Sequence, residues 1–351
     1  MSVWHLRGVV LPEAEERDIY VVGDRLSLEH VGGAETVHEG GFLLPGLVDT
    51  HCHPGTAAIG EPLDEQQLRH HGEELRAQGV SLVRVPGGAG RLPGWFRADR
   101  GMPRVKSAGL AVALTGRFFP GWGRQVSVAD VADVAAQEAA ADGWCKLIVD
   151  WMTDDGDYTT SIPASVVAEA TTRVHECGGR VAVHSQHAEG GRASVDAGVD
   201  SVEHGMHLPT DVLDQMAAQD TALVPTAVTF AELAGPMAQP EVPDRLRQWF
   251  ATGWDRHAAL VRSAFEAGVT VLAGTDLPPG HLTAEVRWLA DAGLPSEVAL
   301  GAASWTARNW LGVPGIDHDA PADVLAFDED PRADLAVLDH PARTVVRGQL
   351  L

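Results

Sequence analysis

The sequence predicts an α/β fold: a (β/α)8 TIM barrel with a small β-sandwich domain built from both chain termini. Two patterns lead to this prediction. Through the middle of the chain, eight apolar strand-like runs alternate with helix-like stretches. Both ends are instead rich in β-favouring residues and turn signals. We therefore expect a barrel over residues 43–319 and a small β-domain formed by residues 1–42 plus 320–351.

The expected barrel strands are mostly continuous apolar runs, which suit a parallel sheet covered on both faces. Several of the intervening helix-like stretches end at a glycine just before the next strand, as helix C-termini often do. In chain order the expected strands are 43–50, 80–85, 110–115, 145–150, 180–185, 200–205, 221–226 and 269–275, and clear helix-like stretches cover 64–79, 131–143, 164–179 and 254–268.

The charge of the chain argues against two classes of partner. The 351 residues include 49 acidic and 26 basic side chains, giving a net charge of −23. Such a chain is repelled by phosphate backbones and anionic membranes, so we expect a small-molecule substrate, no nucleic acid and no membrane. A homo-oligomer is compatible with these features.

Three cysteines are too few for a disulfide framework, and with no signal-peptide pattern they indicate a cytoplasmic protein.

Two histidines follow the first expected barrel strand on one face. Residues i and i+2 of a strand point to the same side, so His51 and His53 point one way and Cys52 the other. Two imidazoles about 7 Å apart along a strand can converge on one metal ion. Alone, such a pair also occurs by chance in exposed loops.

Four further residues occupy the ends of other expected strands. Lys146 lies in the fourth, His184 in the fifth and His204 in the sixth, and Asp276 follows the eighth. In a TIM barrel these ends meet at one mouth, where the fold places its chemistry. Taken singly, the histidines could be core residues and Asp276 a cap or turn residue. One metal site explains all the positions together more economically.

Lys146 stands in the apolar run WCKLIVDW, and only Lys106 is a second lysine in the chain. A surface ion pair does not suit these flanking residues. An unpaired buried ammonium costs several kcal/mol unless it is paired or neutralised. The sequence thus predicts a special environment for this amine.

Taken together, these segments resemble the amidohydrolase superfamily, within it the imidazolonepropionase-like and metal-dependent prolidase branch. The resemblance runs from residue 43 to residue 350 and rests on PGLVDTHCH, Lys146, His184, GVDSVEHG with His204, and AGTD with Asp276. It implies a metal-dependent hydrolase that cleaves an amide (C–N) bond.

The resemblance also implies a role for each residue. Two divalent ions, expected to be Zn, would be bound, one by His51 and His53 with Asp276 and the other by His184 and His204. Lys146 would carry a carbamate derived from carbon dioxide that bridges both ions. A hydroxide bridging the ions would attack, with Asp276 as general base and acid. The ligand set is therefore His51, His53, Lys146, His184, His204 and Asp276, and the catalytic pair is Asp276 and Lys146.

The loops depart from the family pattern, and they decide the substrate. Where relatives often have Gly-Gly-His after strand three, this chain has TGRFFPGWG, and Gln186 replaces a frequent histidine. Arg117 could bind a substrate carboxylate or form a structural ion pair. Tyr158 could bond the reacting oxygen or only shape its loop. The expected substrate-binding residues are Arg117, Tyr158, His187, His207 and His281. Arg84 is interpreted as a structural ion pair, and Trp122 and Trp151 either line an apolar pocket or pack in the core.

The preferred substrate is a dipeptide or an N-acyl amino acid, an interpretation that depends on Arg117. Three alternatives stay open: a single-metal cyclic amidase of the imidazolonepropionase type, a lactonase or phosphotriesterase, and a ligand-binding barrel without catalysis. Lys146 argues against the single-metal form, which needs no bridging carbamate.

Overall fold

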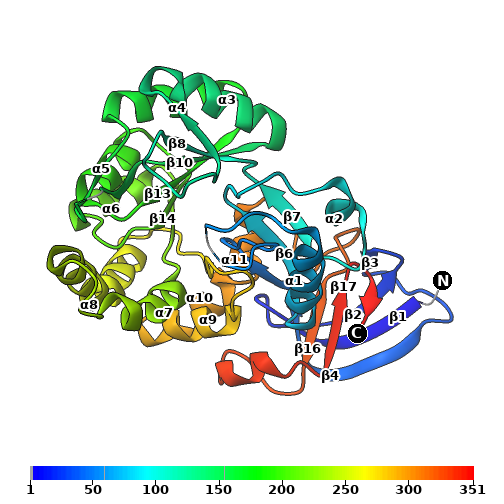
Figure 1. The fold of residues 1–351 in the computed structure, drawn as a ribbon. Coiled ribbons are helices and arrows are strands. Elements are labelled where there is room, and N and C mark those ends of the chain that lie inside the picture. The colour runs from blue at the N-terminus through cyan, green and yellow to red at the C-terminus, as the bar shows by residue number, and fades with distance from the viewer. Residues whose placement is uncertain (1–2, 59, 154) are drawn as a thin grey trace.

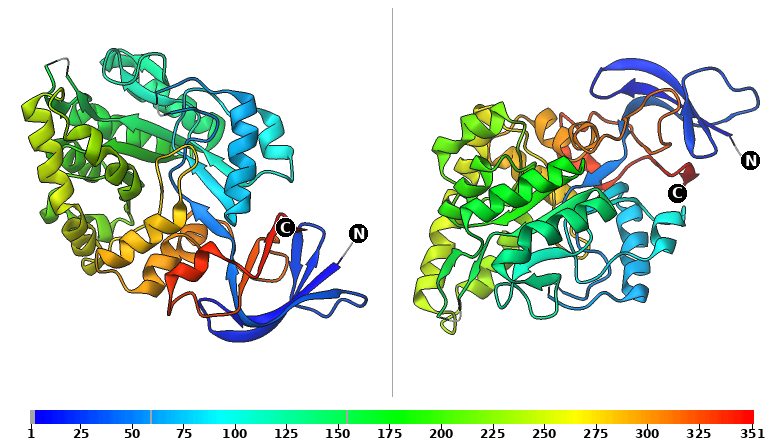
Figure 2. Two further views of the ribbon diagram at one scale, coloured as in Figure 1. Left: turned by 60° about the horizontal axis from the view of Figure 1, so that its bottom comes forward. Right: turned by 90° about the horizontal axis from the view of Figure 1, so that it is seen from above.

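The computed structural model describes residues 3–58, 60–153 and 155–351. The two ends of the chain meet in one seven-stranded sheet beside a larger α/β unit (Figures 1 and 2). The order of this sheet is β18 (Gln349–Leu350), β17 (Arg343–Val346), β16 (Val324–Phe327), β4 (Glu35–Pro45), β1 (Val3–Val10), β2 (Glu15–Val22) and β3 (Arg25–Ser27).

The small domain differs from the expected sandwich in two respects. Its described strands share one hydrogen-bonded sheet, because β4 pairs with β1 on one side and with β16 on the other. In addition, β4 continues to Pro45, which pairs with Val324, so the sheet extends past residue 42. Gly46 then separates β4 from the barrel. A Cβ there would lie 2.5 Å from Ser81 Oγ, so the close packing requires glycine.

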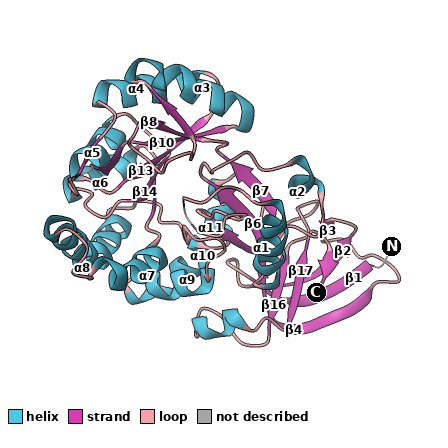
Figure 3. Ribbon diagram, viewed as in Figure 1, coloured by secondary structure: helices cyan, strands magenta, loops and turns pink. Residues whose placement is uncertain are grey.

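The larger unit is built from parallel strands, with helices on the outside (Figure 3). One sheet has the order β5-β6-β7 and another has the order β15-β14-β13-β10-β8-β9. Their bounds are β5 (Leu47–Asp49), β6 (Val80–Val85), β7 (Arg104–Ser107), β8 (Ala111–Leu114), β9 (Arg124–Val126), β10 (Trp144–Ile148), β13 (Arg180–Ser185), β14 (Ser201–His204) and β15 (Ala222–Val224). A parallel bridge between Gly88 and Leu110 links the two sheets.

The eighth expected strand, 269–275, is not a regular strand. It forms one isolated parallel bridge, from Val271 to Leu223 of β15. On its other side the Thr50 amide donates to the Ala273 carbonyl, at 3.0 Å. The Ala273 amide bonds instead to the Ala302 carbonyl at the end of a helix, which interrupts the ladder. The segment still lies between β15 and β5, where the barrel architecture needs its last strand.

The helices follow the predicted alternation. Asp64 caps the first one by accepting from the Gln67 amide, and Leu68 and Leu75 bury its inner face. The stretch expected at 254–268 belongs to a longer helix that begins at Asp244. The helices are α1 (Glu65–Ala77), α2 (Gly94–Ala98), α3 (Val131–Asp142), α4 (Ala164–Glu176), α5 (Ala188–Asp196), α6 (Leu213–Ala218), α7 (Ala227–Met237), α8 (Asp244–Glu266), α9 (Leu282–Asp291), α10 (Ser296–Ala302) and α11 (Trp305–Trp310).

A hairpin of two short strands, β11 (Asp150–Met152) and β12 (Tyr158–Thr160), follows β10. In the described part of the chain, none of the helices combines the length and the apolar character needed to cross a bilayer.

Candidate metal centre

The six predicted ligand side chains line one cavity of about 570 Å³. They come from segments that are far apart in the sequence: just after β5, within β10, β13 and β14, and in the segment after Ala273. The four histidines and the lysine are buried, and the Asp276 side chain is 15% exposed. The cavity holds these residues: His51, His53, Lys146, His184, His204 and Asp276.

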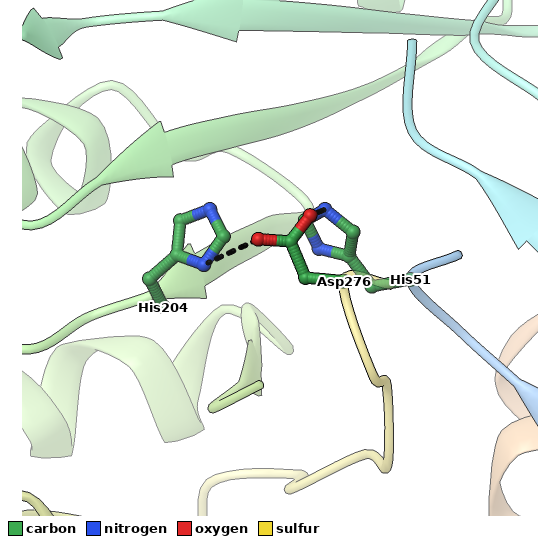
Figure 4. Close-up of side chains that lie close together, drawn as sticks. All are labelled: His51, His204 and Asp276. Carbon is green, nitrogen blue, oxygen red and sulfur yellow. Dashed lines mark ion pairs between the residues drawn. The ribbon is translucent and has the colours of Figure 1, made fainter. Parts of the chain in front are cut away.

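Asp276 is the centre of the tightest part of this group (Figure 4). Its Oδ1 lies 3.1 Å from the Nε2 of His51 and 3.1 Å from the Nε2 of His53. Its Oδ2 lies 3.9 Å from the Nδ1 of His204. One nitrogen each of His51 and His204 and one Asp276 oxygen lie within 4.8 Å of one another. These three donors can share a single metal ion.

The other donors surround this group. The rings of His184 and His204 are 4.5 Å apart between centroids, and those of His51 and His204 are 5.1 Å apart. The Nζ of Lys146 is buried and has no hydrogen-bond partner among the described residues. An ammonium left in this state would be strongly disfavoured.

Two of the six residues have an unusual backbone conformation. His204 has a φ of 71° and Asp276 a φ of 53°, both in the left-handed region. Side chains other than glycine rarely occupy this region, and such strain clusters at functional sites. Two backbone hydrogen bonds stabilise these strained conformations. The Asp276 amide donates to the His51 carbonyl at 2.6 Å, and the Gly205 amide, next to His204, donates to the Ser185 carbonyl at 2.9 Å.

A buried ion pair orients His51. Glu203, next to His204 in β14, accepts two bonds from Nη2 of Arg84, at 2.7 and 2.8 Å. The Oε2 of Glu203 also lies 2.8 Å from Nδ1 of His51. The carboxylate holds the Nδ1 proton, so Nε2 is free to act as a ligand. Arg84 thus forms the structural ion pair that its position predicts. Glu203 stands directly before His204 in VEHG, but only the fold reveals that it reaches His51.

Two other buried carboxylates tie loops to the site. Asp49 accepts from the His51 amide and from the Thr275 hydroxyl, at 3.0 and 2.7 Å, and burial raises the pKa of Asp49 to about 6. Asp150 accepts from the Ser185 hydroxyl at 2.6 Å, and burial raises the pKa of Asp150 to about 7. Neither position stood out in the sequence, because isolated aspartates at strand ends are common.

Burial favours the neutral forms of His184 and His204. It lowers the pKa of His184 to about 3 and that of His204 well below its ordinary value. Burial also lowers the pKa of Lys146 to about 8. Burial raises the pKa of the Asp276 carboxyl. The neighbouring His51 outweighs this effect and holds the pKa of Asp276 well below its usual range. Imidazole nitrogens, one anionic carboxylate and an amine with a lowered pKa form a donor set that fits divalent cations.

The expected substrate-binding residues lie apart from the cavity wall. The described lining residues do not include Arg117, Tyr158, His187, His207 or His281. Arg117 instead donates Nη2 to the carbonyl oxygens of Trp151 and Thr159, at 2.8 and 3.0 Å. Arg117 therefore braces the β11–β12 hairpin through Nη2, and its role as a carboxylate-binding residue stays a prediction.

The other four expected substrate-binding residues lie at these positions. The Tyr158 hydroxyl lies 2.6 Å from Nε2 of His184, so it contacts an expected ligand although Tyr158 is not among the described lining residues. His207 bonds through Nε2 to the Trp249 carbonyl at 3.1 Å. His187 and His281 are the residues that precede α5 and α9, and His281 is exposed. None of these last three histidines is among the described residues that line the cavity.

The stretch TGRFFPGWG builds part of the cavity wall. Phe118, Phe119 and Trp122 line the cavity together with Trp151. The Phe118 and Trp151 rings are 4.8 Å apart, and the Phe119 and Trp151 rings are 4.9 Å apart. Trp122 and Trp151 therefore line an apolar pocket, one of the two roles open to them from the sequence. Trp122 also contacts His53, with ring centroids 5.3 Å apart.

The comparisons with known proteins agree with this architecture. Residues 42–351 match the model of the amidohydrolase family. Uncharacterized protein Rv2915c of Mycobacterium tuberculosis (strain H37Rv) is 36% identical over 98% of this chain and 95% of its own length. Ochratoxinase of Aspergillus niger is 28% identical over 46% of this chain and 35% of its own.

Solved structures extend the likeness to the whole fold. A Xaa-Pro dipeptidase with bound methionine superposes with a TM-score of 0.85 at 21% identity, covering 100% of both chains. The structure of A. niger ochratoxinase superposes with a TM-score of 0.80 at 17% identity, covering 100% of this chain and 96% of that one. These matches confirm the predicted barrel fold. The chain belongs to the amidohydrolase family and is a metal-dependent hydrolase of small molecules.

Proposed function

We propose that this chain hydrolyses an amide C–N bond with two divalent ions held by the six cavity side chains. One observation carries the proposal: the amine of Lys146 is buried without a hydrogen-bond partner, in the same cavity as four histidines and Asp276. A carbamate at this position would replace a costly ammonium by an anion between cations. The single-ion alternative offers no comparable partner for Lys146.

Each side chain then has a binding role. His51 and His53 would hold one ion with Asp276, and His184 and His204 would hold the other. Lys146 would bridge them after its neutral amine attacks carbon dioxide, which forms the N–C bond of the carbamate and releases one proton. The lowered pKa of Lys146, about 8, increases the neutral fraction that can react. Nitrogen and oxygen donors of this kind favour zinc.

The reaction needs a residue that moves a proton. When bound, the ions would make a water molecule acidic and polarise the substrate carbonyl. Asp276 would accept the proton at a carboxylate oxygen and donate it to the leaving nitrogen as the C–N bond breaks. Glu203 would hold the Nδ1 proton of His51 throughout, so that this ring keeps its orientation.

The target bond is better supported than the rest of the substrate. The Xaa-Pro dipeptidase among the similar structures is named for cleavage of a dipeptide, which supports an amide as the target. The preference for a dipeptide or N-acyl amino acid depends on Arg117, which bonds through Nη2 to Trp151 and Thr159 and is not among the described lining residues.

Replacement of Lys146 tests the proposal. Lys146→Ala should lose the bridge, one ion and most of the amide hydrolysis, with partial rescue by added short carboxylic acids such as propionate. Lys106→Ala, which removes the second lysine of the chain, is the matched control and should keep full activity. Full activity of Lys146→Ala would contradict the bridging role.

A single-ion site is the second candidate, because the donors of His51, His204 and Asp276 already lie within 4.8 Å of one another. It would act on a cyclic amide. A chain that carries one ion when fully active would support this candidate. Faster hydrolysis of lactones or phosphotriesters than of any amide would point to an esterase use of the same centre.

A further inference from the structure

Beyond the six ligand residues, the cavity wall is apolar and aromatic. Its aromatic residues come from the loop after β8, from β11 and from α7; they are Phe118, Phe119, Trp122, Trp151 and Phe230. Four of these rings form one continuous cluster with centroid distances between 4.8 and 5.9 Å. Such a wall gains free energy by covering an aromatic or bulky apolar group.

The polar groups of the remaining wall are few. The Thr229 hydroxyl already donates to the Thr275 carbonyl at 2.7 Å. Gln186, which replaces a frequent histidine of the family, offers an uncharged amide. Glu232 is an exposed residue on α7 and is the one ionisable group in the described lining outside the six ligand residues.

The wall therefore offers no cation to a substrate carboxylate. The described lining contains no arginine, and the Nη2 of Arg117, which lies outside this lining, donates to the Trp151 and Thr159 carbonyls. A carboxylate against this wall would lose water, would gain no cationic partner but only the uncharged Gln186 amide, and would meet the negative charge of Glu232. A carboxylate drawn to the ions themselves would compete with the scissile carbonyl and would inhibit.

We propose, building on the amide hydrolysis above, that the substrates are amides with an aromatic or bulky apolar group and no carboxylate beside the scissile bond. Phe118, Phe119 and Trp151 would cover the apolar group, and Gln186 would bond to a neutral polar group. Glu232 would exclude carboxylates by its charge. These substrates thus lack the negatively charged carboxylate that an N-acyl amino acid carries.

A matched pair of substrates tests this class on the metal-replete protein. N-benzoyl-L-phenylalaninamide and N-benzoyl-L-phenylalanine differ only in the amide that replaces the carboxylate, and benzoate release reports cleavage of the same bond in both. We expect kcat/KM to be at least about tenfold higher for the neutral member, mainly through a lower KM. Equal or reversed values would overturn the proposed class but leave amide hydrolysis intact. No benzoate from either compound would count against both proposals.

A charge reversal at the mouth tests the role of Glu232. Glu232→Arg should reduce the preference for the neutral member by about tenfold. The matched control is Glu35→Arg, at an exposed position on β4 of the terminal sheet, which should leave the preference unchanged. An unchanged preference in Glu232→Arg would overturn the charge exclusion.

Discussion

The Oε2 of Glu203 lies 2.8 Å from Nδ1 of His51, and the same carboxylate is held by Arg84. The arrangement links a buried ion pair to a side chain that faces the proposed ions. Partners of this kind fix the tautomer and orientation of a ligating histidine, and their loss typically costs about 10- to 100-fold in metal affinity. We therefore expect the Arg84–Glu203 pair to affect metal affinity as well as stability.

Glu203→Gln should weaken metal binding by about 10- to 100-fold, since an amide holds the Nδ1 proton of His51 less well than a carboxylate. Competition with a chelator measures this. Glu138→Gln is the control, because Glu138 is also a buried carboxylate that pairs with arginines, Arg91 and Arg124, but lies outside the cavity lining. Both variants should lower the unfolding temperature. Equal metal affinity in both would show that Glu203 is structural only.

Asp276→Asn should keep the fold and lower kcat by about 10²- to 10⁴-fold, because the amide cannot accept the proton that the leaving nitrogen requires. Steady-state kinetics on protein with verified metal content measures the loss. The control Asp255→Asn changes an exposed residue of α8 and should be silent. Turnover near that of the unmodified protein would remove Asp276 from the proton transfer.

Arg117→Ala separates two roles for this arginine. If Arg117 holds the aromatic loop against the β11–β12 hairpin, the variant should lose kcat/KM by a similar factor for acidic and neutral substrates and lose about 1–3 kcal/mol of stability. Arg245→Ala, an exposed arginine paired with Asp157, is the control. A loss confined to substrates with a carboxylate would restore the role expected from the sequence.

Glu285 should make the free energy of unfolding depend on pH. Its carboxylate accepts from the Ala227 and Val228 amides at the start of α7, and burial raises the pKa of Glu285 to about 8 from 4.5. Between these values the folded state binds more protons than the unfolded state. The contribution of this group to the free energy of unfolding therefore falls as pH rises from 4.5 to 8, by up to about 1.4 kcal/mol per pH unit.

Glu285→Gln should remove this slope, which urea unfolding at several pH values measures. The control is Glu266→Gln, which changes an exposed glutamate of α8 that pairs with Arg262. This variant should keep the same dependence of stability on pH. An unchanged slope in Glu285→Gln would show that Glu285 is already ionised in the folded protein at neutral pH.

Local sequence patterns account for much of the fold and for the cluster of proposed ligands. The runs at 80–85 and 180–185 coincide with β6 and β13, because continuous apolar strands in a parallel sheet need little information from elsewhere. Strand alternation and the common mouth of a barrel then bring His51, Lys146 and His204 into one cavity.

The remaining features depend on contacts that no local pattern contains. The segment at 269–275 loses its regular ladder because Ala273 bonds to the Ala302 carbonyl. The direction of Arg117 depends on a hairpin more than thirty residues away, and the pairing of Glu203 with Arg84 spans more than a hundred. The sequence shows which charges exist, but the packing decides which of them reach the cavity.

Elemental analysis of the purified chain tests the central claim most directly, with Lys146→Ala measured beside it. Two divalent ions per chain, falling to one or none in the variant, are the predicted result. One ion per fully active chain, unchanged in Lys146→Ala, would contradict a centre bridged by Lys146.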